Sequence, residues 1–137
     1  MELAYPPKII LAWGEAISGN GKIRDWLIKN GYPELGLFVF ALHLKQDARE
    51  WLLNKGHAAL MALIHGAEGN NNALKWLEKN EYIVLHKMAM GADNDDKAIE
   101  WLIVKGFPDF AVIAQKIRFV KNEIDRDNND VHRISSE

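Results

Sequence analysis

Apolar and polar residues alternate along this chain in a pattern that repeats every 25 residues. Trp26, Trp51, Trp76 and Trp101 mark the period, and each is followed directly by a leucine. No insertion or deletion interrupts the four copies. Self-similarity at a fixed period is the signature of repeated structural units, so the fold prediction starts from the repeat and not from single residues.

Each copy begins with a segment that is typical of a short amphipathic helix. In the second copy it covers residues 47–56. A side-chain oxygen of Asp47, or of Asn72 in the next copy, is expected to cap the helix start, and Gly56 suits the left-handed conformation that ends a helix. Glu81 replaces this glycine in the third copy. We therefore expect a strained or differently shaped turn there.

A second helical segment follows in each copy, beginning near Pro33 and Pro108 in two of them. Proline is favoured at the first position of a helix, where its missing N–H group is not needed. Apolar residues then recur at steps of three or four, which places them on one face of a helix. The three apolar columns are Leu35, Leu60, Leu85 and Phe110; Phe38, Leu63, Met88 and Ile113; and Leu42, Ala67, Ala92 and Ile117.

The N-terminal residues carry the same stripe one period earlier, at Ile10, Trp13 and Ile17. We therefore predict an all-α fold, an α-α superhelix (solenoid) of about four 25-residue helix-turn-helix repeats preceded by one N-terminal capping helix. The predicted repeat domain is 1–124, with the capping helix at 7–18, repeats at 21–45, 46–70, 71–95 and 96–122, and a polar C-terminal tail at 125–137.

The pattern Ala-x-x-Trp-Leu-x-x-x-Gly, at 48–56 and 98–106, resembles helices of divergent ankyrin-like repeats. Over roughly residues 8 to 122 the chain resembles the broad class of two-helix repeats that includes HEAT, tetratricopeptide and ankyrin arrays. Its period is shorter than the period of those families, and the ankyrin Thr-Pro-Leu-His turn is absent, so no single family is assigned. The resemblance implies a binding scaffold.

Composition narrows the function classes further. The chain has 137 residues, 17 basic and 19 acidic side chains, a formal net charge of −2 and no cysteine. This length is typical of one domain. The lack of cysteine excludes disulfides, thiolate zinc sites and a cysteine nucleophile. The near-neutral balance argues against a nucleic-acid binder. No apolar run resembles a signal peptide or a membrane span, so we expect a soluble, cytoplasmic protein that does not bind membranes.

Residues beside the core stripe of the second helices form the most promising candidate binding surface. Three of the five histidines lie on it, and one of them stands three residues before a glutamate. The candidate binding residues are Phe40, His43, Met61, His65, Glu68, His86, Met90 and Asp93.

Two functions are compatible with this surface. The first is binding of a protein or peptide partner through one helical face, with no catalytic residues, metal or cofactor. The alternative is a small-ligand, metal-binding or enzymatic pocket built on His43, His65 and His86. The sequence has no Gly-rich phosphate loop and no Gly-x-Ser-x-Gly elbow, which favours the first. The last repeat, at 111–121, lacks a clearly polar capping helix, which leaves self-association through the C-terminal end open.

Overall fold

The computed structural model describes the backbone of residues 3–135 and the side chains of residues 3–129. Within that range every regular element is an α-helix and no strand occurs, which confirms the all-α prediction. The helices are α1 (Pro7–Ile17), α2 (Gly21–Lys29), α3 (Pro33–Leu42), α4 (Gln46–Asn54), α5 (Ala58–Ala67), α6 (Asn71–Lys79), α7 (Ile83–Ala92), α8 (Asp96–Val104) and α9 (Pro108–Ser135). None of the helices in this range is both long enough and apolar enough to cross a membrane.

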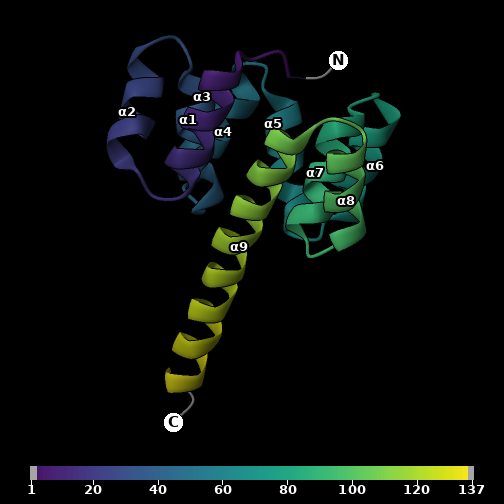
Figure 1. Cartoon of the computed structure of the whole chain (residues 1–137). Helices are drawn as coiled ribbons and strands as arrows, with labels where there is room; N and C mark the ends of the chain where they lie inside the picture. Colours follow the sequence, from purple (N-terminus) through teal and green to yellow (C-terminus); the bar gives the residue numbers. More distant parts are fainter. Residues whose placement is uncertain (1–2, 136–137) are drawn as a thin grey trace.

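The helices follow a regular packing order (Figure 1). We call the even-numbered helices outer helices and the odd-numbered helices inner helices. Each outer helix packs between the inner helix before it and the one after it, and each inner helix also packs against the next inner helix. In the described part of the chain the outer helices do not pack directly against one another. The bounds of α2, α4, α6 and α8 are spaced by the 25-residue period of the sequence.

The first and last inner helices also pack against each other. α9 contacts both α7 and α1, and it touches α3 and α5. The contact with α1 is close at Gly14, where a Cβ atom would lie 3.2 Å from Cδ1 of Ile113. The sequence led us to expect an uncovered face on the last helix. In the structure α1 covers part of that face, because both helices carry an apolar stripe of the same phase and lack a further neighbour of their own.

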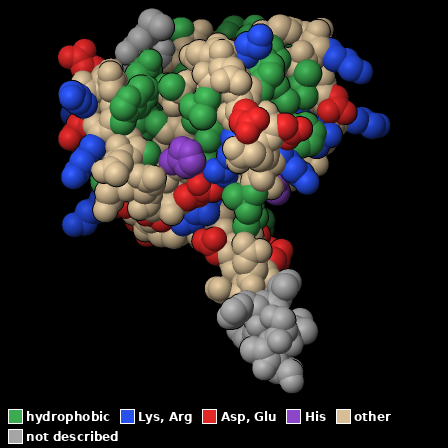
Figure 2. Space-filling model, turned by 180° about the vertical axis from the view of Figure 1, so that it is seen from behind, with side chains coloured by type: hydrophobic (Ala, Val, Ile, Leu, Met, Phe, Trp, Pro, Cys, Tyr) green, Lys and Arg blue, Asp and Glu red, His purple; other side chains and the backbone are tan. Residues whose placement is uncertain are grey.

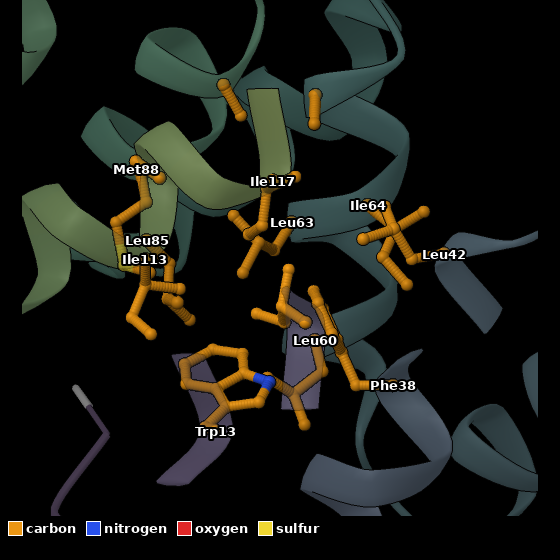
Figure 3. Packing of buried hydrophobic residues seen from close by; sticks show 14 of the residues in the cluster. Trp13, Phe38, Leu42, Leu60, Leu63, Ile64, Leu85, Met88, Ile113 and Ile117 are labelled. Atoms are coloured by element: carbon orange, nitrogen blue, oxygen red, sulfur yellow. The ribbon is translucent and has the colours of Figure 1, made fainter. Parts of the chain in front are cut away.

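The core is built from equivalent positions of the inner helices (Figure 3). One large apolar side chain from each gathers in a single cluster, and all of them are at most 1% exposed. Trp13 and Phe38 meet edge to face, with ring centroids 5.1 Å apart, the arrangement favoured by the ring quadrupoles. Burial of each such side chain stabilises the fold by roughly 1.5–3 kcal/mol. The five residues are Trp13, Phe38, Leu63, Met88 and Ile113.

The outer helices are capped two residues earlier than the sequence suggested. The side-chain oxygens of Asn20, Asn70 and Asp95 accept hydrogen bonds from backbone amides of α2, α6 and α8. Asp47 lies inside the first turn of α4, where it accepts only from the neighbouring amide of Ala48. The prediction that Asp47 and Asn72 cap these helices was therefore wrong. Helices α4 and α6 begin at Gln46 and Asn71, before the residues that were expected to cap them.

The turn from each outer helix to the next inner helix has one conformation in all four copies. Its central residue has a positive φ at Gly31, Gly56 and Gly106, between 85° and 94°. Glu81 also adopts this conformation, with φ 65°. The turn at Glu81 therefore keeps its shape and bears the strain of a side chain in the left-handed region.

The C-terminal segment continues the last inner helix. α9 extends to Ser135, well beyond the other helices, and its lower half projects from the body (Figure 1). The sequence predicted a polar tail at 125–137; in the structure the backbone of 125–135 is helical, and the last two residues lie outside the described part. The side chains of residues 125–129 are exposed.

Candidate functional site

The predicted candidate residues are spread over several separate contacts. Only His65 and Glu68 come together, with 3.5 Å between His65 Nδ1 and Glu68 Oε1. Glu68 also binds the guanidinium of Arg49 at 2.8 and 3.4 Å, and Arg49 Nε donates to the carbonyl of Ala41 at 2.9 Å. Glu68 therefore helps to join α3, α4 and α5, which is a structural task.

The other two histidines of the stripe lie in different surroundings. His43 is exposed at the C-terminal end of α3. His86 is half-buried on α7, with its Nε2 4.0 Å from Oε2 of Glu78. Desolvation is the main cause that lowers the pKa of both imidazoles, with Lys45 adding to the effect at His43. At His86 Glu78 opposes the shift. The two residues have different partners and positions.

The remaining candidates also have separate roles. Met61 is buried in the core, Met90 is half-buried, and the carboxylate of Asp93 lies 3.0 Å from the ammonium of Lys121. Among the residues whose side chains are described, no group of three or more His, Cys, Asp or Glu side chains is placed to hold a metal ion. The geometry thus gives no support to one pocket that combines the three histidines.

The tryptophans of the outer helices form a second set of repeated contacts, which the sequence analysis did not foresee. Each of three tryptophan rings lies nearly parallel to the aromatic ring that follows the next turn. The pairs are Trp51–His57, Trp76–Tyr82 and Trp101–Phe107, with centroid separations of 5.7, 5.8 and 6.4 Å and interplanar angles of 11°, 12° and 9°. Offset stacking of this kind holds each tryptophan over its turn and leaves part of the ring open to solvent. Trp76 is 39% exposed.

A groove lies in front of one of these tryptophans, between α3 and α4. It has a volume of about 530 Å³ and is lined by Leu37, Phe40, Lys45, Asp47, Ala48 and Trp51. We call it the tryptophan groove. Phe40, one of the predicted candidates, is half-buried there, and the guanidinium of Arg24 lies over its ring at 4.4 Å. The groove thus combines apolar and aromatic walls with a lysine and an aspartate.

The repeat places related residues at the corresponding positions of the next two copies. Phe40, His65 and Met90 share one register position, and each stands 11 residues before a tryptophan. The ammonium of Lys87, on α7, lies 5.4 Å from the centroid of the Trp101 ring, on α8. Three of the eight predicted residues therefore share the register position that lines the groove at Phe40. The regular distance to the tryptophan is the signal that the sequence analysis left unused.

The basic residues of α9 whose side chains are described do not form a free positive patch. Lys116 lies 3.7 Å from Glu15, Lys121 pairs with Asp93, and Arg118 binds Asp96 at 2.7 Å and the carbonyl of Gly91 at 2.9 Å. Several of these acceptors lie at or after the C-terminal end of α7, where the helix dipole favours cations. On the face in Figure 2, acidic and basic side chains are likewise intermixed.

Comparison with known proteins gave no match: no family model, no curated protein and no solved structure is recognisably similar to this chain. The function therefore has to be argued from the geometry alone.

Proposed function

We propose that this chain is a helical-repeat scaffold, an α-α superhelix of four two-helix repeats and an N-terminal helix, that binds a peptide segment of a protein partner. The observation that carries the proposal is the tryptophan groove. It is open to solvent, mostly apolar, and bounded by Phe40 and Trp51, the residue types that most often anchor protein interfaces.

The groove fits a peptide with one large apolar side chain next to polar groups. Phe40 and Leu37 offer an apolar floor, and the ring of Trp51 is held in place by its stacking on His57. A wall that is already ordered loses little conformational freedom on binding. Lys45 and Asp47 provide one cation and one carboxylate for groups of the peptide backbone or its flanking side chains.

A protein partner is favoured over the other ligand classes. The lysines and arginines of α9 whose side chains are described are already paired, so they offer little attraction to a phosphate backbone. The sequence contains none of the nucleophile motifs that would suggest an enzyme. A cytoplasmic location is part of the same proposal, since a chain without cysteine suits a reducing compartment.

Selection from a displayed random peptide library tests this function. Peptides enriched on the wild-type protein are measured by fluorescence anisotropy against wild type, Phe40→Ser and Leu53→Ser. Leu53 is the matched control because it is an exposed leucine, 53% accessible, outside the groove. We expect Phe40→Ser to weaken binding by about tenfold or more and Leu53→Ser to leave it unchanged.

Two results would contradict the proposal: no enrichment above an unrelated helical protein, or enriched peptides that bind Phe40→Ser as tightly as wild type. Thermal unfolding followed by circular dichroism shows whether Phe40→Ser still folds. If it does not, Leu37→Ser replaces it as a second change in the same wall.

A further inference from the structure

A second groove follows the line where α9 packs against α1. It has a volume of about 300 Å³, and its walls include Lys8, Leu11, Gly14, Asp109, Val112 and Lys116. We call it the seam groove. A neighbouring hollow of about 330 Å³ shares Val112 and Lys116 and adds Phe119, so the open surface continues along α9.

Several large apolar side chains on this surface are exposed to solvent. Leu11 and Phe119 are each 67% exposed, and Val112 is 46% exposed. Contiguous exposed apolar residues of this size typically mark an interaction site. On α9, Val112, Lys116 and Phe119 are spaced by four and three residues, the spacing with which one helix contacts another in a groove.

The projecting half of α9 has a composition that does not favour an isolated helix. Asn122 still bonds to Asn94 and Ile124 packs against the core, so the projection begins after them. Residues 125–135 extend for about 16 Å at the rise of an α-helix. Asp125, Asp127, Asn128 and Asn129 are poor helix formers, and their side chains are exposed. A short helical segment of this composition has little stability without a partner. One face of this segment, at Asp125 and Asn128, lines a hollow with Leu42 of the same chain, whereas Arg126 and Asp127 are exposed. The seam groove can supply a contact for that exposed face.

We propose that two copies of the chain associate about a twofold axis, with their α9 helices antiparallel, so that the projecting half of each α9 occupies the seam groove of the other. Phe119 lies near the crossing point. Because the axis is twofold, every contact is made twice, so that two small grooves together contribute to the stability of one dimer. The proposal is independent of peptide binding in the tryptophan groove.

Charge supports this choice of occupant. Of the two lysines that line the groove, Lys116 already lies 3.7 Å from Glu15, so Lys8 is the cation that remains for an acidic partner; the lining has one carboxylate, Asp109. The described part of the projecting half is acidic, with Asp125 and Asp127 against Arg126, and the Arg126 guanidinium is already paired with Glu123. In the antiparallel arrangement Asp127 of one copy comes near the end of the groove that holds Lys8 of the other copy. Opposite charges at such positions favour this orientation over a parallel one.

Sedimentation-velocity ultracentrifugation of the full chain, from micromolar to sub-millimolar concentration, tests the association. We expect a monomer–dimer equilibrium whose dissociation constant rises by about tenfold or more in Phe119→Asp. Leu53→Asp is the control, because it places the same charge at another exposed apolar site, and it should leave the equilibrium unchanged. A protein that is monomeric throughout, or a dimer that Phe119→Asp does not weaken, overturns the proposal.

A charge exchange tests the orientation. Lys8→Glu and Asp127→Lys each place like charges together in their own dimers, so each should weaken self-association. In the mixed dimer both contacts then join opposite charges, one in the native order and one reversed. This holds only if Lys8 of one copy faces Asp127 of the other. Native mass spectrometry should then show the mixed dimer in excess over both homodimers. A statistical mixture would rule out the antiparallel arrangement.

Discussion

The ammonium nitrogen of Lys121 lies 3.0 Å from Oδ1 of Asp93, and this ion pair ties α9 to the C-terminal end of α7. Lys121 is almost completely buried, at 8% exposed. Next to it, the side-chain amides of Asn94 and Asn122 bind each other, at 3.0 Å in the shorter contact. The connection between α7 and α8 thus fixes the course of the last helix where it leaves the body.

Asp93→Ala should lower the free energy of unfolding by about 1–2 kcal/mol, because it leaves the buried Lys121 ammonium without its carboxylate. Urea denaturation measures the change. Glu100→Ala is the control, since Glu100 is exposed on α8, and it should shift the unfolding free energy by no more than about 0.5 kcal/mol. Equal effects of the two substitutions would show that the ion pair contributes nothing specific.

Glu81→Gly should stabilise the protein. Glu81 has φ 65°, and glycine occupies the equivalent turn position in the other three copies. Relief of the left-handed strain is worth about 1 kcal/mol, partly offset by the greater freedom of glycine in the unfolded chain. The urea midpoint should rise with an unchanged slope. The reverse change in an equivalent turn, Gly56→Glu, should lower it, and a lower midpoint for Glu81→Gly would contradict this account of the turn.

Periodicity was sufficient to predict the existence of the repeated helices and their buried faces, but not the residues at which they begin or the helical course of residues 125–135. A column of residues at a 25-residue spacing must fall at equivalent places if each copy folds alike, and Trp13, Phe38 and Leu63 are all fully buried. The contact between α1 and α9 was not predictable in this way. It depends on how successive helices are oriented, which is set by many packing contacts and is not encoded by the period of the sequence.

The candidate binding surface was predictable only in part. Helical register placed Phe40 beside the core stripe, and Phe40 does line an open groove. The same register grouped His43, His65 and His86, although these residues stand at three different positions of their helices. A stripe on a helical wheel does not show which side chains are held by ion pairs from a neighbouring helix, as Glu68 is held by Arg49.

Gly36→Ala should destabilise the fold although alanine favours helices. A Cβ atom at Gly36, in α3, would lie 2.8 Å from the carbonyl oxygen of Arg24 and 2.4 Å from Cγ1 of Ile28. The backbone of α2 cannot move aside cheaply, so overpacking should cost about 1–3 kcal/mol, more than the helix-propensity gain of about 1 kcal/mol.

Gly21→Ala is the matched control for this prediction. Gly21 is the first residue of α2, and its Cβ atom would meet only the guanidinium of Arg24, at 3.4 Å. It should be neutral or mildly stabilising. Urea denaturation of the two variants measures the contrast. Equal stability of both would mean that α2 and α3 are not packed as closely at Gly36 as the structure has them.

The stability of the protein should fall as the pH is lowered through the range in which histidine titrates. Burial holds the pKa of His86 below the ordinary histidine value, and the same cause lowers that of His43. The unfolded chain therefore takes up protons at a higher pH than the folded protein does. The stabilisation is fully present above the unfolded pKa, near 6.5, and is lost as the pH falls below it.

Urea midpoints measured between about pH 7.5 and about pH 5.5 test this sign. The midpoint of the wild-type protein should decrease toward low pH, and His86→Gln should flatten that dependence because it removes one of the two imidazoles whose pKa is lowered. His65→Gln is the control, since His65 is more exposed than His86 and lies beside Glu68. If His86→Gln leaves the slope of stability against pH unchanged, the half-buried position of His86 against Glu78 is not what the folded protein adopts in solution.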